Sequence, residues 1–394
     1  MSESFDLAIV GAGIHGTGIA QAAAAAGHSV LLLEQSSVAA GSSSRSSKLI
    51  HGGLRYLETG QFALVRESLR ERALLLRLAP GLVHVQRFYI PVYAHTRRRP
   101  WQLRCGLALY SLLAGLRPES RFGTVPRSQW DALDGLETRD LQAVFWYLDG
   151  QTDDRALTRA VLRSAEQLGA QLRCPARFEA ARLEEAGVRL RYTCGAAMME
   201  SEARVLVNAA GPWAESVARR IEPAIAVPAL ECVQGAHLVL PGTLERGVYY
   251  LESPHDGRAV FVIPWKGALL IGTTETRFEG DPARVTASAA EIHYLLGVLK
   301  HYFPRWRARS EADLIESFAG LRVLPAGAER AFRRSRETQL IPDRSRAPRV
   351  LSIYGGKLTT WRAVAERALA RIAASLPRRP AVARTDQLML RPPE

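Results

Sequence analysis

The feature that most constrains the fold lies at the start of the chain, where FDLAIV at residues 5–10 leads directly into GAGIHG at 11–16. A short apolar run of this kind suits a buried parallel strand. The small-residue stretch TGIAQAAAAAGH then predicts a helix closed by Gly27, and SVLLLE predicts a second strand that ends at Glu34. A strand, a glycine-rich turn, a helix and a second strand in this order form a dinucleotide-binding βαβ unit.

Each glycine of this turn meets a steric demand of dinucleotide binding. Gly11 permits the tight turn, Gly13 lets the backbone approach a pyrophosphate, and Gly16 lets the helix and strand pack closely. The N–H groups at the start of the helix are placed to bind the pyrophosphate oxygens. Glu34 is placed to bind ribose hydroxyls, and its charge argues against the 2′-phosphate of NADP. The pattern predicts a bound dinucleotide without separating NAD from FAD.

The segment after Glu34, SSVAAGSSSRSSKLIHGGLRYLE at 36–58, favours FAD. A soluble NAD enzyme is expected to continue with another strand and helix, whereas small hydroxylated residues pack poorly in a core and prefer turns and caps. A serine-rich loop that leads into two glycines can press its backbone and hydroxyls against a cofactor. We therefore expect residues 42–53 along the pyrophosphate and the flavin edge. The alternative is a flexible surface loop, which the ending LIHGGLRYLE disfavours.

Two distant segments repeat the pattern of strand, small-residue turn and helix. They are EARVLVNAAGPWAESVA at 202–218 and RVLSIYGGKLTTWRAVAERALARIAASL at 349–376. Thr359 and Thr360 can cap the second helix, whose N-terminus would face an anion. Three such units spread along the chain predict one nucleotide domain that is interrupted by insertions, as in large two-domain flavoproteins.

Residues 229–275 predict an antiparallel sheet inserted between these segments. GVYYLES, DGRAVFVIPW and GALLIGTTE read as successive strands, with hairpin turns of positive φ at Asp256–Gly257 and Lys266–Gly267. The expected fold class is α/β with an α+β insert: a doubly wound, Rossmann-type FAD-binding domain and an antiparallel-sheet substrate domain. The FAD-binding domain is expected to comprise residues 1–85, 150–220 and 335–394, and the substrate domain residues 86–149 and 221–334.

Composition bounds the class of protein. Of the 394 residues, 47% are apolar and 23% are charged, which favours a globular chain with a full core. The length suits one large two-part enzyme or two to three domains. We expect no transmembrane helix, since no run of about 20 apolar residues occurs, and no signal peptide, since the first residues lack a basic region. The four scattered cysteines predict reduced thiols and no metal site.

The net charge of +13 favours anionic partners such as phosphates or anionic lipid headgroups. Nucleic acid is not expected as a partner, because no helix-turn-helix, RNP or zinc-finger pattern occurs and aromatic residues make up only 7%. Lysine is scarce, with four among 52 basic residues, and two of the four, Lys48 and Lys357, fall in the glycine-rich segments described above.

Five segments carry the most specific pattern, namely SSRSSKLIHGGLRYLE (43–58), NAAGPW (208–213), VIPWKGALLIGTTE (262–275), FAGLRVLPAG (318–327) and SIYGGKLTTWR (352–362). Together they resemble FAD-dependent glycerol-3-phosphate dehydrogenases, respiratory enzymes of the broader glycine oxidase and D-amino-acid oxidase superfamily. The resemblance covers residues 4 to 372 and implies oxidation of sn-glycerol 3-phosphate to dihydroxyacetone phosphate by hydride transfer to FAD N5, with a quinone as electron acceptor. Family members usually carry a further helical C-terminal domain, and we expect this chain to be without it.

The motifs and the resemblance also imply the residues of the site. Arg55, Tyr56, Arg322 and Lys357 are expected around the substrate phosphate and hydroxyls, where arginine forks suit phosphate geometry. Residues expected at the cofactor are Gly11, Gly13, Ile14, His15, Gly16, Glu34, Ser42, Ser43, Ser44, Ser46, Ser47, Lys48, His51, Gly52, Arg177, Phe178, Ala209, Ala210, Gly211, Trp213, Gly355, Gly356, Lys357, Leu358 and Thr359.

The base that takes the hydroxyl proton is expected to be a histidine, since the histidine pKa lies near working pH. His51, in the serine-rich motif, and His237, on an apolar strand, are both candidates, and the sequence leaves the choice open. Thr274 and Glu275 of GTTE are expected to line the pocket.

The segment RRRPWQLRCGLALYSLLAGLR at 97–117 sets basic residues and a tryptophan before an apolar helix too short to span a bilayer. This pattern suits insertion into an anionic membrane interface, although a buried helix with solvated arginines fits as well. Since the family are peripheral membrane enzymes, we expect a cytoplasmic protein on the inner face of the cytoplasmic membrane. The sequence does not predict the oligomeric state.

Four alternative functions are left open by the sequence. An amine or amino-acid oxidase on the same scaffold would hold a carboxylate with one arginine, and a related phosphorylated alcohol is a possible substrate. A non-catalytic FAD-binding protein would not need Arg55, His51, Arg322 and Lys357. An NAD dehydrogenase would be colourless when purified.

Overall fold

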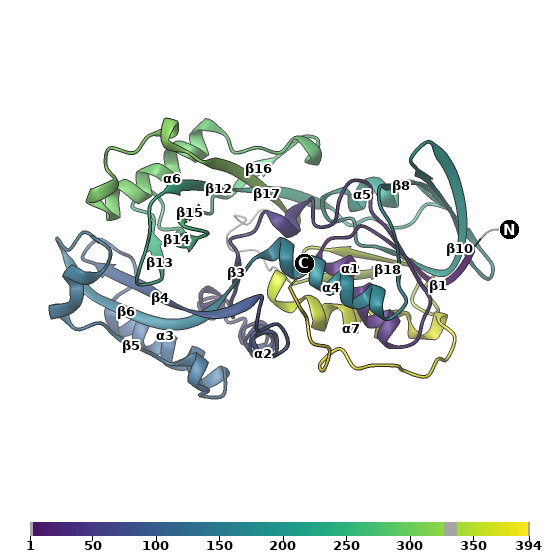
Figure 1. The fold of residues 1–394 in the computed structure, drawn as a ribbon, viewed down its shortest axis with the longest axis horizontal. Helices are drawn as coiled ribbons and strands as arrows, with labels where there is room; N and C mark the ends of the chain where they lie inside the picture. The colour runs from purple at the N-terminus through teal and green to yellow at the C-terminus, as the bar shows by residue number, and fades with distance from the viewer. Residues whose placement is uncertain (1–2, 327–336, 393–394) are drawn as a thin grey trace.

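The computed structural model describes residues 3–326 and 337–392, whose two β-sheets form two bodies that lie side by side (Figure 1). The helices are α1 (Ile14–Ala25), α2 (Phe62–Leu78), α3 (Pro100–Leu113), α4 (Asp154–Gln167), α5 (Ala214–Ala218), α6 (Ala289–Tyr302) and α7 (Trp361–Ile372). The predicted domain boundary at 334 and 335 lies outside the described residues, and the domain assignment as a whole stays a prediction.

The first sheet, sheet A, is built on the predicted nucleotide unit. Its strands are β1 (Glu3–Val10), β2 (Val30–Leu33), β7 (Gln171–Arg173), β8 (Ala176–Glu184), β9 (Gly187–Cys194), β10 (Ala197–Asn208), β11 (Ile221–Glu222), β18 (Gln339–Pro342) and β19 (Val350–Tyr354). The order is β11-β8-β9-β10-β1-β2-β7, with β19 beside β10 and β18 beside β19. The run from β2 through β1 and β10 to β19 is parallel, as the three predicted strand, turn and helix units require.

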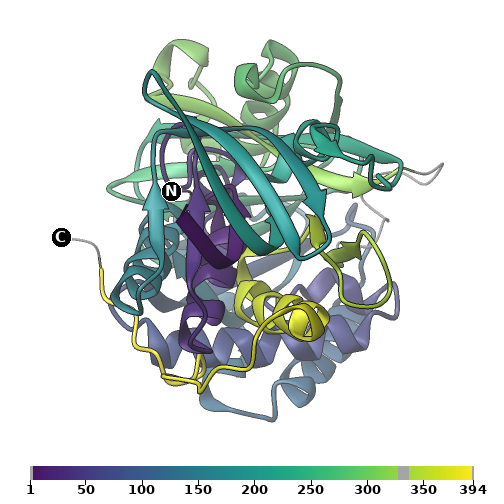
Figure 2. The same cartoon turned by 90° about the vertical axis from the view of Figure 1, so that its right-hand side faces the viewer.

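The helix α1 follows from its composition, because a helix that is apolar on all sides is stable only when buried on all sides. Its alanines are buried and pack with Leu7, Leu32 and Ala368 in one cluster. Figure 2 shows α1 in purple beside the yellow α7, and α4 covers it as well. The helix ends at Ala25 and Gly27 adopts a φ of +86°, which confirms the predicted closure.

The second sheet, sheet B, combines strands from both halves of the chain. They are β3 (Leu49–Ile50), β4 (Val83–Tyr93), β5 (Phe122–Thr124), β6 (Leu141–Thr152), β12 (Leu230–Pro241), β13 (Val248–Glu252), β14 (Ala259–Trp265), β15 (Ala268–Gly272), β16 (Thr276–Phe278) and β17 (Glu316–Pro325). The order is β16-β12-β15-β14-β13-β4-β6-β3, with β17 beside β12 and β5 beside β6. The pairs are antiparallel apart from β13 with β4, which are parallel.

The predicted turns of this sheet differ from one another. Lys266 and Gly267 both have positive φ and close a tight hairpin between β14 and β15, as predicted. Asp256–Gly257 lies in a longer loop, where only Gly257 has positive φ. The predicted hairpin is confirmed here too, since β13 and β14 pair antiparallel with Glu252 opposite Ala259. Its turn is longer than two residues, because the Ser253 N–H bonds to the Arg258 carbonyl and residues 254–257 lie between them.

The short strand β3 brings the serine-rich segment into sheet B. Leu49 pairs with Gln151 and Ile50 with Gly150 of β6. The segment therefore starts against sheet A, crosses to the second sheet and continues as the single turn η2 (Leu54–Leu57). This crossing places residues 42–58 along the boundary between the two bodies.

Candidate functional site

A cavity of about 430 Å³ lies where the carboxyl ends of the parallel strands face β12 and β17 of sheet B. This location and volume match the usual ligand site of an α/β sheet, at roughly 300–1,000 Å³. Among the described residues, the charged side chains of the lining are Arg45, Arg177, Arg220, Arg322 and Lys357, opposed by Glu34 alone. The excess of positive charge suits a ligand that carries several phosphate groups.

The N-terminus of α1 opens into this cavity and fits an anion. Gly13 caps the helix without a side-chain hydrogen bond, and the first turn contains no acidic residue. Gly11 can approach the next strand because it lacks a Cβ, which would lie 2.8 Å from the Ala209 carbonyl oxygen. Ser43 Oγ accepts a hydrogen bond of 2.9 Å from the Ile14 N–H, so the serine-rich segment lies against the same turn. These features fit the pyrophosphate of a dinucleotide.

Glu34 lies one residue beyond the end of β2 and lines the cavity. Its Oε2 accepts from the Ala12 N–H at 2.9 Å, and its Oε1 accepts from the Ser36 N–H at 2.9 Å. Oε1 also accepts from Ser36 Oγ at 3.2 Å. Each carboxylate oxygen has two lone pairs, so Oε2 retains one for a ribose hydroxyl. Arg177 and Phe178 line the same cavity. The donors and acceptors present at this end fit the nucleotide half of FAD.

The serine-rich segment divides into side chains that line the cavity and side chains that hold the segment in place. Ser42, Ser43, Ser46 and Ser47 belong to the lining. Ser44 does not, and its carbonyl oxygen accepts a hydrogen bond of 2.6 Å from Lys48 Nζ.

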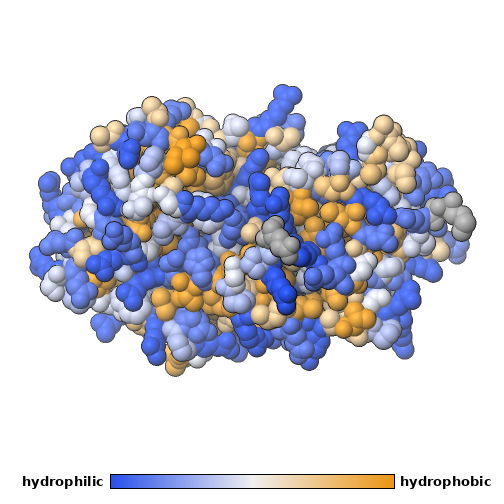
Figure 3. Space-filling view, viewed as in Figure 1, coloured by the Kyte–Doolittle hydropathy of each residue, from blue (hydrophilic) through white to orange (hydrophobic). Residues whose placement is uncertain are grey.

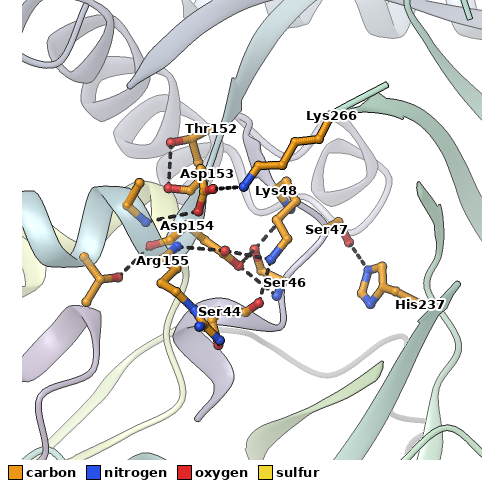
Figure 4. Close-up of polar contacts among 12 residues, drawn as sticks. Ser44, Ser46, Ser47, Lys48, Thr152, Asp153, Asp154, Arg155, His237 and Lys266 are labelled. Carbon is orange, nitrogen blue, oxygen red and sulfur yellow. Dashed lines mark hydrogen bonds and ion pairs between the residues drawn. The ribbon is translucent and has the colours of Figure 1, made fainter. Parts of the chain in front are cut away.

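Lys48 is placed differently from the prediction that it follows the cofactor. Its ammonium group is buried and lies 2.7 Å from Asp154 Oδ1 in an ion pair whose carboxylate side chain has no exposed surface (Figure 4). Ser46 donates to the other oxygen of the same carboxylate. The correction has a physical reason: an ammonium group taken out of water requires a charged partner, and Asp154 supplies it.

His237 lies on β12 with its imidazole in the cavity wall. Its Nε2 is 2.9 Å from Ser47 Oγ (Figure 4). Its ring stacks on Phe318 with centroids 5.1 Å apart. Burial, together with the nearby charges of Arg322 and Lys48, lowers the pKa of His237 to about 3. The imidazole is therefore neutral throughout the physiological range.

His51 also lines the cavity and directly follows β3. Its main chain is held by one hydroxyl, since the His51 N–H donates to Thr359 Oγ1 at 3.1 Å and the His51 carbonyl accepts from it at 3.2 Å. This contact joins the motif at 43–58 to the motif at 352–362. The structure thus brings the two glycine-rich motifs together.

Tyr56 and Lys357 form the next part of the lining. Lys357 Nζ lies 3.8 Å from the centroid of the Tyr56 ring. Gly53 adopts a φ of +81°, and a Cβ there would lie 2.4 Å from the Tyr56 ring, so a glycine is required for this packing. Arg55 stays outside the lining, with its guanidinium carbon 5.5 Å from the Tyr56 centroid. Its predicted contact with substrate stays a prediction.

Arg322 enters the lining from β17 and is oriented by polar neighbours. Its Nη1 is 3.2 Å from Glu275 Oε1, and its Nη2 donates to Thr273 Oγ1 at 3.1 Å. Thr274 was expected to line the pocket, but it is buried behind it and donates to Glu291 Oε1 at 2.6 Å. Glu275 pairs with Arg322, which itself lines the cavity. The expectation that Thr274 and Glu275 line the cavity was wrong, since neither belongs to its lining and each side chain contacts a neighbouring residue instead.

Most of the predicted cofactor residues meet in this one cavity. Gly11, Gly13, Ile14, His15, Glu34, Ala209, Ala210, Gly211, Trp213, Gly355, Gly356, Leu358 and Thr359 all belong to its lining. Gly16 and Gly52 do not. A Cβ on Gly16 would lie 1.8 Å from the Gly11 carbonyl, and one on Gly52 would lie 2.5 Å from the Tyr110 hydroxyl, so both serve close packing.

Several residues at the site were missed by the sequence analysis. Arg45 and Arg220 line the cavity, and the first stands inside the quoted serine-rich motif. The carboxylates Asp149 and Asp154 lie behind the motif in DGQTDD at 149–154. A signal was present in the sequence, because three aspartates fall within the six residues that directly follow the apolar run VFWYL.

Two negative observations apply to the described residues alone. No group of three histidine, cysteine or carboxylate side chains is arranged to hold a metal ion. Within the same ranges, no helix combines the length and the apolar character that crossing a bilayer requires.

Comparison with known proteins places the chain among flavoproteins. A family model described as FAD dependent oxidoreductase matches residues 6–367. A glycerol-3-phosphate dehydrogenase of Pseudomonas aeruginosa is 39% identical over 386 residues, which cover 94% of this chain and 72% of that protein. A D-erythritol 1-phosphate dehydrogenase of Brucella abortus is 35% identical over 377 residues, which cover 94% of this chain and 74% of that protein.

Solved structures agree. The glycerol-3-phosphate dehydrogenase of Bacillus halodurans, complexed with FAD, superposes with a TM-score of 0.77 at 26% identity, covering 98% of this chain and 68% of that one. The glycine oxidase of Geobacillus kaustophilus superposes with a TM-score of 0.72 at 19% identity, covering 94% and 95%. The second likeness concerns the fold alone and confirms the predicted fold class.

Proposed function

The chain belongs to the FAD-dependent oxidoreductase family, and we propose that it oxidises sn-glycerol 3-phosphate to dihydroxyacetone phosphate. The observation that carries the proposal is the cavity itself, in which Arg322, Lys357, Tyr56 and two histidines stand beside the FAD-binding turns. A phosphate dianion is held best by several cationic donors, whereas a carboxylate needs one arginine. The name of the relative from Pseudomonas aeruginosa supports the same substrate.

The cofactor is held by the three turns of sheet A and the serine-rich segment. The start of α1 and Ser43 bind the pyrophosphate, and Glu34 binds the ribose. The start of η10 (Leu358–Thr360) offers further N–H groups beside Gly355 and Gly356. When bound, FAD supplies an acceptor at flavin N5 for the hydride that leaves the substrate carbon.

The substrate is held at the opposite end of the lining. Lys357 and Arg322 bind the phosphate oxygens, and the Tyr56 hydroxyl orients the glycerol hydroxyls. Glu275 keeps the Arg322 guanidinium in one orientation through a contact of 3.2 Å. Fixing the substrate at several points holds the carbinol C–H in a reactive position, which is worth several powers of ten in rate.

We assign the base to His51. The oxidation requires that the hydroxyl proton leaves as the carbinol hydrogen leaves, and a base works best when its pKa is near the working pH. The pKa of about 3 makes His237 a poor proton acceptor at neutral pH. His51 is less enclosed, lines the cavity and is held by Thr359. His237 then serves as a neutral hydrogen-bonding group beside Ser47.

The decisive experiment is anaerobic reduction of the bound flavin by a panel of candidate substrates. We expect bleaching of the flavin absorbance by sn-glycerol 3-phosphate, and no bleaching by glycine or D-amino acids. Bleaching by D-erythritol 1-phosphate alone would assign the alternative substrate named for the Brucella abortus relative. Bleaching by glycine alone would reject phosphate recognition, and bleaching by no compound would favour a non-catalytic FAD-binding protein.

The electron acceptor is proposed to be a quinone at the inner face of the cytoplasmic membrane. The exposed side chains Trp101, Leu112 and Leu116 lie on or just beyond α3. Figure 3 shows hydrophobic side chains among hydrophilic ones at the lower left, where Figure 1 places α3. Arg117 joins Arg70 and Arg77 around a neighbouring cleft of about 460 Å³. Apolar side chains flanked by arginines suit an anionic bilayer surface.

Vesicle binding tests this surface. Arg98 should be left intact, because it pairs with Glu58 and Glu252. We expect Arg97→Glu, Arg99→Glu and Arg104→Glu together to reduce sedimentation with anionic vesicles. The same charge change on exposed residues of β8 and β9, at Arg182, Arg189 and Arg191, should have a smaller effect. Equal sedimentation of both triple variants would reject α3 as the docking surface.

The electron acceptor is tested separately: turnover with menadione in the absence of oxygen would support quinone use.

A further inference from the structure

The segment 149–154 lies directly behind the part of the chain that carries the site. Gln151 and Gly150 of β6 pair with β3, and the Thr152 N–H donates to the Lys48 carbonyl at 2.9 Å. A Cβ on Gly150 would lie 2.8 Å from the Ile50 carbonyl oxygen, so glycine is required for this approach. A buried carboxylate stands at each end of this short pairing.

Asp154 holds the serine end. Its Oδ2 accepts hydrogen bonds from the Ser46 N–H at 3.0 Å and from Ser46 Oγ at 2.7 Å. Its Oδ1 accepts from Lys48 Nζ at 2.7 Å (Figure 4). These bonds fix the chain on both sides of Ser47, whose hydroxyl faces His237.

Asp149 holds the glycine end through Tyr110. The Tyr110 hydroxyl donates to Asp149 Oδ2 at 2.7 Å and accepts from the Gly52 N–H at 2.8 Å. Arg72 Nη1 lies 2.5 Å from Asp149 Oδ1, and the three side chains are almost fully buried. Burial raises the pKa of Tyr110 well above its usual value, so the hydroxyl keeps its proton.

We propose that Asp149 and Asp154 are positioning residues that fix the two ends of the site segment 46–52, with Tyr110 as the link at Gly52. This inference rests on the proposed function, because the segment carries the base His51 and leads to Tyr56. A buried N–H that loses its acceptor is costly, so the Gly52 backbone has one favourable position while the link is intact. Neither Asp149 nor Asp154 belongs to the lining of the cavity.

The glycine end is tested by Tyr110→Phe, which keeps the ring and removes the hydroxyl. We expect KM for sn-glycerol 3-phosphate to rise about tenfold, because the loss of one buried hydrogen bond weakens the substrate end of the site by about that factor. FAD affinity, measured by fluorescence of released FAD, should change less than about twofold. Hydrogen–deuterium exchange of peptides covering 49–58 should be faster than in the parent.

The matched control is Tyr249→Phe. Tyr249 is equally buried and donates its hydroxyl to Asp134 at 2.9 Å, without contact to the site segment. It should lower the melting temperature like Tyr110→Phe but leave KM and the exchange of 49–58 unchanged. Unchanged exchange in Tyr110→Phe, or an equal KM rise in Tyr249→Phe, would overturn the positioning role.

The serine end is tested by Asp154→Asn, which keeps the shape and removes the charge. We expect faster exchange of peptides covering 42–48 and FAD affinity weaker by about tenfold, since Ser46 and Ser47 line the cofactor part of the cavity. Unaltered FAD affinity and exchange would overturn this half of the proposal. If the parent shows no reaction with glycerol 3-phosphate, the proposed function fails, whereas the exchange and FAD measurements still decide on the anchors.

Discussion

Two cations lie against the ring of Tyr56. Lys357 Nζ is 3.8 Å and the Arg55 guanidinium carbon 5.5 Å from its centroid. Cation–π contacts of this kind contribute about 0.5–2 kcal/mol and increase when they are desolvated. The ring therefore keeps both charges close to the end of the cavity where we propose that the substrate phosphate binds, although of the two cations Lys357 belongs to the lining and Arg55 does not.

Arg55→Ala tests whether the second cation reaches the substrate. We expect FAD content to stay at the parent level and KM for glycerol 3-phosphate to rise by about ten- to a hundredfold, the range for a charge-assisted hydrogen bond. Stopped-flow flavin reduction and flavin absorbance measure both quantities. The control is Arg87→Ala, whose guanidinium stacks on Trp146 away from the site. Full activity of Arg55→Ala would remove Arg55 from the site.

The roles of His51 and His237 can be distinguished by how their substitution affects catalysis. We expect His51→Asn to lower kcat by about 10²–10⁴, the usual contribution of a general base, and to abolish the rise of rate with pH as the base loses its proton. His237→Asn retains a hydrogen-bonding side chain and should lower kcat far less while keeping that rise. The pH profile of flavin reduction is the measurement. The reverse ranking would move the base to His237.

At the scale of elements, the β3–β6 pairing shows how a buried and an exposed ion pair differ within one region. Lys48 with Asp154 and Lys266 with Asp153 are both 2.7 Å long, but the side chain of Lys48 is 6% exposed and that of Lys266 66% (Figure 4). Removing one partner of a buried pair leaves an uncompensated charge, whereas an exposed pair is screened by water.

Lys48→Met should lower the free energy of unfolding by about 3–5 kcal/mol, and Lys266→Met by less than about 1 kcal/mol. Urea unfolding measures both. The double variant Lys48→Met with Asp154→Asn should recover part of the loss, because it removes the stranded charge and keeps an oxygen that can accept from Ser46. Similar values for the two lysine variants would show that burial does not decide the strength of these pairs.

The elements that follow strong local patterns were predictable from sequence. The strand, turn and helix units near Gly11, Gly211 and Gly355 meet at neighbouring parallel strands, as expected. The strands β4 to β6 were not predicted, because their residues alternate poorly and their pairing depends on partners elsewhere in the chain. The side-chain directions of Lys48 and Arg55 could not be predicted either, because a motif places a residue near a site but does not determine which way its side chain points.

At the scale of the whole molecule, buried neutral histidines tie stability to pH. Burial lowers the pKa of His15 to about 4 and that of His237 to about 3. Both values lie below the pKa of about 6.5 expected in the unfolded chain. Protons therefore bind the unfolded chain first, so this stability is present above pH 6.5 and is lost as pH falls toward 3.

We expect the holoprotein to lose about 1.4 kcal/mol of unfolding free energy for each of these histidines between pH 7.5 and 5.5. Urea unfolding at both pH values, with free FAD held constant, measures the loss. His237→Asn should reduce the difference in unfolding free energy between pH 7.5 and pH 5.5, whatever the stability of the variant at either pH. An undiminished pH dependence in that variant would mean that His237 is not buried neutral.

The three turns that surround the cofactor come from the beginning, the middle and the end of the chain. Gly11 and Gly13 are synthesised first, Ala209 to Gly211 much later, and Gly355 to Thr359 close to the end. A ribosome-bound chain can fold its first βαβ unit early, but it cannot enclose the flavin until the turn at 355–359 has emerged. The cofactor site is therefore complete only after residues up to 359 have been synthesised.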